Sequence, residues 1–107
     1  AAIAAVETVD SCIGELVAAV QAADGQMLLT ADHGNCEVMW DKNADSPHTA
    51  HTTNPVPLIL VNGPPGVQLT DGRLADLAPS LLAMLGIDQP ASMTGRAVFA
   101  GLATAAK

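Results

Sequence analysis

The stretch QMLLTADHGN, residues 26–35, decides the fold class because it passes directly from an apolar run into a polar turn. A short apolar run that follows a turn is typical of a strand buried in a sheet. Gly34 lets the backbone turn sharply where the run ends. In open α/β sheets, functional groups collect just past the carboxyl ends of strands. We therefore expect a strand over residues 26–31 that leads into a candidate site.

The remaining elements are read outward from this strand. Apolar residues spaced by three and four over residues 2–23 predict an amphipathic helix, with Gly25 as its stop. Residues 58–61 (LILV) predict a second buried strand. A second helix is expected from Asp76, as N-cap, to Leu85, with Gly86 closing it. This order of helices and strands predicts an α/β layered domain.

Length and charge limit the classes of function. The chain has 107 residues, enough for one small domain, and a net charge of −7. Its four basic residues are Lys42, Arg73, Arg96 and Lys107. Nucleic-acid binding needs several basic side chains to displace counterions, and anionic membrane surfaces attract basic segments. We therefore expect neither nucleic acid nor a membrane as a partner.

The cysteines and the first residues indicate the compartment. Cys12 and Cys36 form no CxxC pair or disulfide framework, which is typical of a reduced, cytoplasmic chain. Residues 1–22 are apolar but carry three acidic residues and no basic n-region, so they predict neither a signal peptide nor a membrane span. The chain opens in a helical pattern without an N-cap, so we expect it to be part of something longer.

The polar turn after the first strand offers the first candidate metal ligands. Asp32 and His33 supply a carboxylate and an imidazole, which suit Mn²⁺ or Zn²⁺. A polar turn in which Asp32 acts only as a cap explains the same residues. Glu37 lies close by in the sequence, and an indirect role for it stays open.

The second candidate segment is HTAHTTNP, residues 48–55. It should return His51 to the sheet edge just before the second strand. His48 and His51 cannot both be assumed to bind metal, because HxxH is a weak pattern. The threonine hydroxyls around them suit donors that orient metal ligands, but they are equally ordinary in a loop.

Together these motifs make the chain resemble a known family. TADHGNCE (30–37) followed by HTAHTTNPVPLI (48–59) is similar to the cofactor-independent (2,3-bisphosphoglycerate-independent) phosphoglycerate mutases of the alkaline phosphatase superfamily. LADLAPSLLAMLG (74–86), TGR (94–96) and the opening AAIAAVETVDSCIGELV (1–17) are similar to the same family. The resemblance covers almost the whole chain, and the two histidine motifs together are highly specific.

The resemblance implies a fold and a metal site. Residues 1–107 would be a C-terminal fragment of the metal-binding phosphatase domain, an α/β, alkaline-phosphatase-like layer of helices packed on a mostly parallel sheet. Two divalent ions, usually Mn²⁺, bind in that family. The resemblance assigns Asp32 and His33 to one ion and His51 to the other, and it leaves His48 out.

The resemblance also implies an activity for the full-length protein. It would interconvert 3-phosphoglycerate and 2-phosphoglycerate through a phosphoserine in glycolysis and gluconeogenesis, as a cytoplasmic monomer. None of Ser11, Ser46, Ser80 and Ser92 lies in a context that matches the family's nucleophile. This chain would therefore contain no catalytic residue and only part of each metal site, and we expect it to be inactive alone.

Three other interpretations remain open from the sequence. Another enzyme of the superfamily, such as a phosphopentomutase, phosphatase or sulfatase-like hydrolase, shares the DHG motif and the helix over residues 76–85. A non-catalytic binding module that keeps the fold would explain the missing serine. In a purely structural interpretation, Asp32 and His33 cap a turn and His51 is a loop residue.

Overall fold

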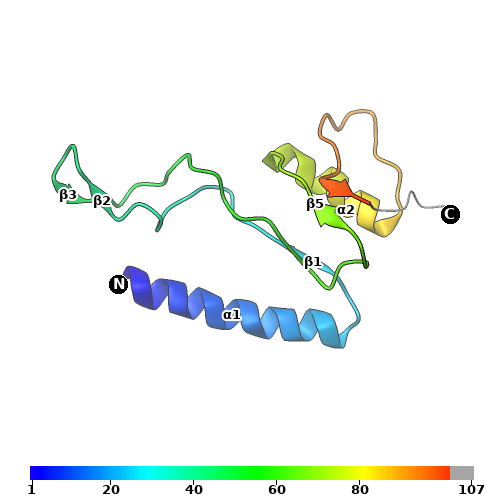
Figure 1. The fold of residues 1–107 in the computed structure, drawn as a ribbon, viewed down its shortest axis with the longest axis horizontal. Coiled ribbons are helices and arrows are strands. Elements are labelled where there is room, and N and C mark those ends of the chain that lie inside the picture. Colours follow the sequence, from blue (N-terminus) through cyan, green and yellow to red (C-terminus); the bar gives the residue numbers. More distant parts are fainter. Residues whose placement is uncertain (102–107) are drawn as a thin grey trace. The chain divides into compact units, whose positions relative to one another are not determined.

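The computed structural model describes residues 1–101, and the chain divides into two compact units. The first unit is residues 1–62, and the second begins at Gly63. The elements in chain order are α1 (Ala2–Ala22), β1 (Met27–Leu29), β2 (Trp40–Asp41), β3 (Ser46–Pro47), β4 (Ile59–Val61), β5 (Gln68–Leu69), the 3₁₀ turn η1 (Leu74–Asp76), α2 (Leu77–Leu85) and β6 (Phe99–Ala100) (Figure 1).

Helix α1 confirms the predicted first helix but ends differently from the expectation. Asp24 has a left-handed backbone with φ 54°, and its N–H donates to the Gln21 carbonyl at 3.0 Å. The Gly25 N–H donates to the Val20 carbonyl at 2.8 Å. These two bonds form the Schellman pattern, in which the left-handed position is usually glycine. The predicted stop at Gly25 is therefore wrong by one residue, because Asp24 makes the turn.

The rest of the first unit is one long hairpin. Strand β1 pairs antiparallel with β4, placing Met27 opposite Val61, and β2 pairs antiparallel with β3. The chain between these pairs forms two arms, residues 30–39 and residues 48–57, which Figure 1 shows running side by side. The hydroxyl of Thr30 donates to the Pro57 carbonyl at 2.8 Å, so pairing continues past β1.

The antiparallel pairing differs from the expected mostly parallel sheet. Among residues 1–101 the structure has three two-stranded sheets, and all three are antiparallel. Strands β1 and β4 were expected to be buried, but Ile59 is 47% exposed. The physical reason is that residues 30–58 fold back as a hairpin, which permits only antiparallel pairing of the strands they join. The chain is a mixed helix and strand protein in the described part, and the larger parallel sheet stays a prediction.

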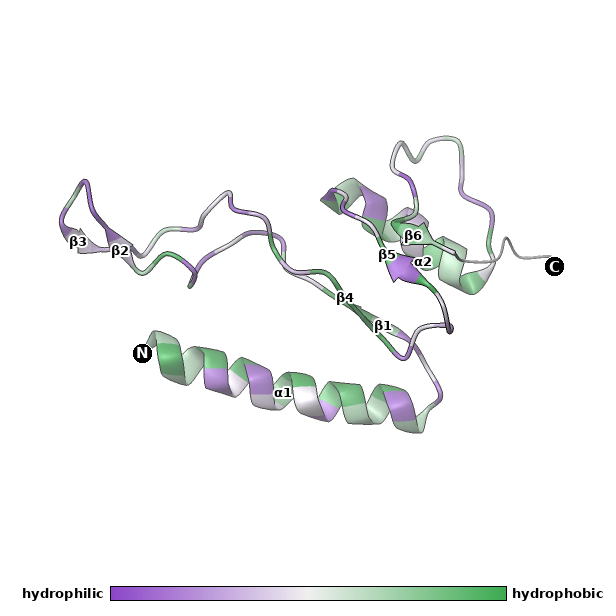
Figure 2. Ribbon diagram, viewed as in Figure 1, coloured by the Kyte–Doolittle hydropathy of each residue, from purple (hydrophilic) through white to green (hydrophobic). Residues whose placement is uncertain are grey.

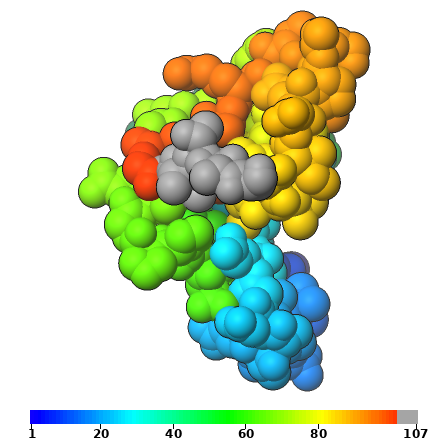
Figure 3. All heavy atoms as spheres, turned by 90° about the vertical axis from the view of Figure 1, so that its right-hand side faces the viewer, coloured from blue at the N-terminus to red at the C-terminus, as the bar shows by residue number. Residues whose placement is uncertain are grey.

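The second unit encloses a small buried centre. The side chains of Asp76, Ser80 and Val98 are buried, at 4%, 0% and 2% exposure. Strands β5 and β6 pair antiparallel, and α2 begins directly after η1. As predicted, α2 ends at Leu85 and Gly86 closes it with φ 70°. The chain from the end of α2 into the following loop, yellow to orange in Figure 3, lies at the surface, where Leu85 is 71% exposed.

Helix α1 carries several exposed apolar side chains. None of its residues is buried, and Ile3, Val9 and Leu16 are each more than half exposed. Green apolar residues alternate with purple polar ones along the helix in Figure 2. The expected packing of this helix on a sheet is therefore not observed within residues 1–101. Within that same range, no helix has both the length and the apolar character needed to cross a membrane.

Candidate metal centre

Asp32 and His33 lie three and four residues after the end of β1, which is shorter than the strand predicted over residues 26–31. The Asp32 side chain is 81% exposed and the His33 side chain is 38% exposed. The His33 Nε2 atom lies 3.5 Å from Asp32 Oδ1, so the two candidate ligand atoms are neighbours. Adjacent residues converge in this way because the chain leaves the strand's alternation after Leu29.

The hairpin brings His51 to the same place. The isolated bridge between Gly34 and Thr52 aligns the two arms, with the Thr52 N–H donating to the Gly34 carbonyl at 2.8 Å and the Gly34 N–H donating back at 3.2 Å. The preceding residues on the two arms are His33 and His51, and their ring centroids lie 3.7 Å apart. His51 was expected at the sheet edge just before the second strand, and it lies eight residues before β4, beside His33. Its role as a metal ligand stays a prediction.

One further carboxylate ties the two arms together. One oxygen of Glu37 accepts a hydrogen bond from the Asn35 N–H at 3.1 Å, and the other accepts one from the Thr52 hydroxyl. The Thr52 hydroxyl is the main cause that lowers the pKa of Glu37 below its ordinary value of 4.5, and the Asn35 N–H adds to it. A hydrogen bond donated to the ionised form favours that form. The Glu37 side chain is therefore an anion held between the arms.

The donor set of Asp32 and His33 fits a divalent metal ion. With its proton on Nδ1, His33 donates to the Gly34 carbonyl at 3.0 Å, which leaves Nε2 free to bind a metal. Two ligand atoms on one ion lie roughly 3.0–3.4 Å apart, because each bond is about 2.1 Å long. The observed 3.5 Å between Nε2 and Oδ1 is close to this separation.

The site is incomplete within the described residues. No group of three or more His, Cys, Asp or Glu side chains there is arranged to hold a metal ion. His48 is not part of the cluster, and its Nε2 is a buried atom without a hydrogen-bond partner. Its backbone N–H donates to the Met39 carbonyl at 2.9 Å, so its backbone helps to pair the arms. The structure thus joins Asp32, His33 and His51, whereas His48 lies near Glu37, whose pKa it helps to lower.

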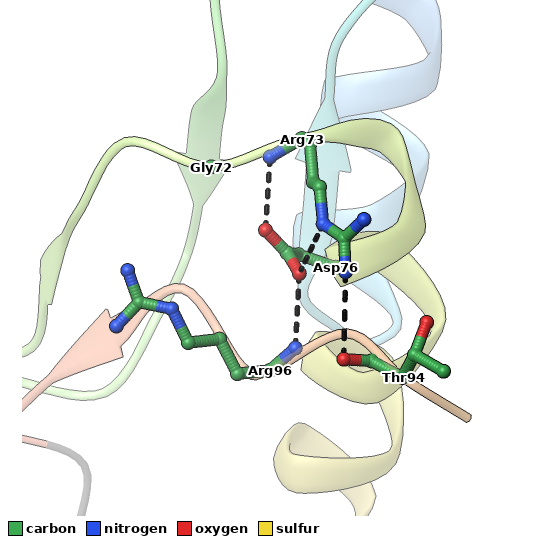
Figure 4. A pocket seen from close by; sticks show the side chains of 5 residues that line it. All are labelled: Gly72, Arg73, Asp76, Thr94 and Arg96. Carbon is green, nitrogen blue, oxygen red and sulfur yellow. Dashed lines mark hydrogen bonds and ion pairs between the residues drawn. The ribbon is translucent and has the colours of Figure 1, made fainter. Parts of the chain in front are cut away.

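The second unit contains a different polar cluster, shown in Figure 4. A pocket of about 300 Å³ is lined by Gly72, Arg73, Asp76, Thr94 and Arg96. The Asp76 carboxylate accepts the Arg73 N–H and the Arg96 N–H, each at 2.9 Å. These two backbone donors lower the pKa of Asp76 below its ordinary value of 3.8. The Arg73 guanidinium points at Asp76, whereas the Arg96 side chain extends away from it.

The contacts of this carboxylate show that it is structural. Asp76 holds the start of η1 and the loop at residue 96 together, rather than capping α2 with its side chain as the sequence predicted. The buried Ser80 hydroxyl donates to the Asp76 carbonyl and accepts the Val98 N–H at 3.0 Å. Both hydrogen bonds of the Ser80 hydroxyl are therefore made inside the unit.

The sequence did not single out the pair formed by Glu37 and Thr52. The sequence indicates the threonine hydroxyls only as a group and Glu37 only as a neighbour of the DHG motif. The contact between Glu37 and Thr52 follows from the register of the hairpin. The pairing of residues 27 and 61 would place residue 34 opposite residue 54, so the register shifts by two residues before the observed bridge between Gly34 and Thr52.

Comparison with known proteins gives the family. The model of the metalloenzyme superfamily matches residues 1–89. The chain is 61% identical over 98 residues to a protein of Cereibacter sphaeroides (strain ATCC 17029) and 62% identical over 99 residues to one of Syntrophotalea carbinolica. Both are named 2,3-bisphosphoglycerate-independent phosphoglycerate mutase, and both matches cover 92% of this chain. A third relative of the same name, from Rhodopseudomonas palustris, is 58% identical over 100 residues.

The chain belongs to the metalloenzyme superfamily, since that family's model matches most of its residues. It spans 19% of the length of the curated relatives that it matches. The matched region contains both arms of the hairpin and the three predicted ligands.

Proposed function

We propose that this chain supplies part of the metal centre of a cofactor-independent phosphoglycerate mutase, an isomerase that interconverts 3-phosphoglycerate and 2-phosphoglycerate. The observation that carries the proposal is the hairpin register, which sets the His33 and His51 rings 3.7 Å apart beside Asp32. The relatives that share these segments are named as such mutases. In this proposal residues 1–107 are the C-terminal part of the phosphatase domain.

The residues of this chain would hold two divalent ions, which we propose to be Mn²⁺. Asp32 and His33 would bind one ion, and His51 would bind the other. When bound, such ions neutralise charge on a transferring phosphoryl group and lower the pKa of a nucleophile. The chain's own contribution is positioning, because the Gly34 carbonyl holds the Nδ1 proton of His33 and so keeps Nε2 available.

The net charge of −7 supports a division of roles within a longer protein. A phosphoglycerate substrate is anionic, and four basic residues in an acidic chain are a poor clamp for it. We propose that the serine nucleophile and the substrate-binding arginines and lysines lie on the part of the relatives' length that this chain does not span. We further propose a cytoplasmic monomer in which β1 and β4 join a larger, mostly parallel layered sheet that covers the apolar face of α1.

The test is an assay of the full-length natural protein with 3-phosphoglycerate, before and after removal of divalent metal by a chelator. We expect 2-phosphoglycerate to form, the activity to be lost on chelation and Mn²⁺ to restore it. The isolated chain of residues 1–107 is the matched control and should form no product. Hydrolysis of phosphate esters without isomerisation would contradict the proposal in favour of a phosphatase, and turnover by residues 1–107 alone would contradict the division of roles.

A further inference from the structure

Besides the bond from Thr30 to Pro57 near β1, side-chain contact between the two arms of the hairpin gathers around Gly34 and Thr52. The arms are joined by backbone hydrogen bonds at Gly34 and Thr52, and the next backbone bond toward the tip is the one from His48 to Met39. Next to the bridge between Gly34 and Thr52, the Thr52 hydroxyl donates a hydrogen bond to the Glu37 carboxylate. Among the described residues, this is the one hydrogen bond between the arms that joins two side chains.

The backbone at residue 34 is shaped around this contact. A Cβ atom on Gly34 would collide with Thr52 Oγ1 and with Glu37 Oε1. Gly34 is also buried, although no other residue of the first unit is. The absence of a side chain at Gly34 therefore leaves room for the carboxylate and the hydroxyl to meet, and the DHG glycine has a packing role as well as a turning role.

On one arm the contact adjoins a predicted ligand, because Thr52 follows His51, and on the other arm Glu37 lies four residues after His33. Gly34 follows His33 and accepts its Nδ1 proton. The same Glu37 carboxylate holds the Asn35 N–H, so it fixes the turn that follows the DHG motif. A shift of either arm would change the separation of the two histidine rings, which is 3.7 Å.

We infer that Glu37 and Thr52 form a positioning pair that sets the spacing of His33 and His51 for divalent metal binding. This inference rests on the proposed metal site but not on the identity of the substrate. Glu37 is exposed, so the pair contributes more to the alignment of the arms than to a buried core. Residues that orient metal ligands typically change metal affinity by about 10–100-fold when they are altered.

The experiment measures Mn²⁺ affinity of the full-length natural protein by the loss of the free-Mn²⁺ electron paramagnetic resonance signal. Thr52→Val removes the hydroxyl at nearly constant volume, and Thr52→Ser is its matched control because it keeps the hydroxyl. Glu37→Ala removes the carboxylate, and Glu37→Gln keeps one acceptor and adds one donor. We expect Thr52→Val and Glu37→Ala each to bind Mn²⁺ about 10–100-fold more weakly and Thr52→Ser to stay near wild type. Glu37→Gln should lie between Glu37→Ala and wild type, because its amide can replace only one of the two oxygens that accept hydrogen bonds.

A double variant and a metal-free measurement separate positioning from general damage. If the two side chains act as one pair, Glu37→Ala combined with Thr52→Val should lose no more affinity than either single change. In the metal-free protein, Thr52→Val should speed hydrogen exchange at the Gly34 and Thr52 amides while leaving the thermal unfolding midpoint nearly unchanged. Equal losses for Thr52→Ser and Thr52→Val, or wild-type affinity in Thr52→Val, would overturn the inference.

The outcomes also distinguish this inference from the proposed function. A wild-type protein that binds Mn²⁺ but does not isomerise phosphoglycerate would refute the mutase and leave the pair standing if Thr52→Val binds more weakly. An active mutase in which Thr52→Val keeps its Mn²⁺ affinity and its amide protection would refute the pair alone. A wild-type protein without any Mn²⁺ affinity would refute both.

Discussion

The two units use polar groups in opposite ways. In residues 1–62 no side chain is buried, and the polar residues that gather around His33 and His51 face solvent along an open hairpin. In the second unit the carboxylate of Asp76 and the hydroxyl of Ser80 are buried, and all of their assigned partners lie within the unit. Buried polar groups that are fully paired specify a structure, whereas exposed ones remain available to a ligand. The comparison supports the proposed metal site in the first unit and a structural role for the buried polar groups of the second.

The largest effect should come from removing a predicted ligand in the first unit. In the full-length natural protein, Asp32→Asn and His51→Ala should each lower Mn²⁺-dependent turnover on the order of a thousandfold, because a few kcal/mol of charge stabilisation are lost. The thermal unfolding midpoint without metal should hardly change, since Asp32 is 81% exposed. The measurement is steady-state turnover at saturating Mn²⁺.

The matched control for this prediction is His48→Ala. His48 lies on the same arm, outside the cluster of His33 and His51, and should keep most of the turnover. Near-normal activity in Asp32→Asn or His51→Ala would remove that residue from the ligand set. A loss in His48→Ala as large as that in His51→Ala would show that the structure has separated the two histidines wrongly.

The second unit should respond in stability instead. Ser80→Ala leaves the buried Val98 N–H without its acceptor, and an unpaired buried donor costs about 1–3 kcal/mol. We expect a loss of that size in the free energy of unfolding measured with urea, with unchanged Mn²⁺ affinity. Ser92→Ala is the control, because Ser92 is exposed and should change stability by less than about 0.5 kcal/mol. A fall in Mn²⁺ affinity without a fall in stability would break the comparison of the units.

The sequence predicted local elements better than it predicted their pairing. Periodicity located both helices within about two residues, because the i, i+3, i+4 pattern is a local property. The pairing of Met27 with Val61 joins residues far apart in the chain, and no local pattern encodes it. Apolar strands of this length read equally well as parallel core strands, which is why the antiparallel hairpin was not foreseen.

The candidate site was predictable only in its ligand types. Carboxylate and imidazole groups past a strand end indicate Asp32 and His33 without any coordinates, and the family resemblance adds His51. The sequence could not pair Glu37 with Thr52, because that contact depends on hairpin register. The sequence predicts Asp76 as the N-cap of α2, and Asp76 does occupy that position. Its carboxylate, however, accepts the backbone N–H groups of Arg73 and Arg96 instead of one in α2. The Arg73 donor is local, but the Arg96 donor lies 20 residues away and leaves no signature in the sequence around Asp76.

The pH dependence of unfolding gives a smaller test of the same contrast. The backbone N–H donors of Arg73 and Arg96 hold the pKa of Asp76 below 3.8, its ordinary and unfolded value. The unfolded chain therefore binds this proton at a higher pH than the folded one, and stability falls as the pH is lowered. The contribution of Asp76 should be present above about pH 3.8 and lost as the pH falls through its lower folded value.

The measurement for this prediction is the urea midpoint between pH 6 and pH 2.5, a range chosen to bracket the transition. Asp76→Asn should be less stable at pH 6 and should show a shallower decline below pH 4. Glu37→Gln is the comparison from the first unit, where the carboxylate is exposed and should contribute less to the slope. An equal change of slope in both variants would show that the buried and the exposed carboxylate stabilise the fold alike.

The smallest effect concerns how the two helices end, where the units share one geometry but not one residue. Helix α1 ends with Asp24 at φ 54°, and α2 ends with Gly86 at φ 70°. The outer bond of the Schellman pattern is present in both helices. It runs from the Gly25 N–H to the Val20 carbonyl in α1 and from the Ile87 N–H to the Leu82 carbonyl in α2. A left-handed backbone costs an L-residue about 1–2 kcal/mol, and Asp less than most. Asp24→Gly should therefore stabilise the protein by at most about 1 kcal/mol, since glycine's greater unfolded-state entropy offsets part of the relief.

Gly86→Ala is the opposite change at the matching position and should destabilise the protein by roughly 1 kcal/mol. Gly25→Ala separates the two accounts of where α1 stops. The backbone of Gly25 is not left-handed, and an added Cβ would lie 3.4 Å from the Val20 carbonyl oxygen, a tight but tolerable approach. If thermal unfolding shows a larger loss for Gly25→Ala than for Gly86→Ala, the stop lies at Gly25 after all, and the terminus of α1 differs from that of α2 in geometry as well as in residue.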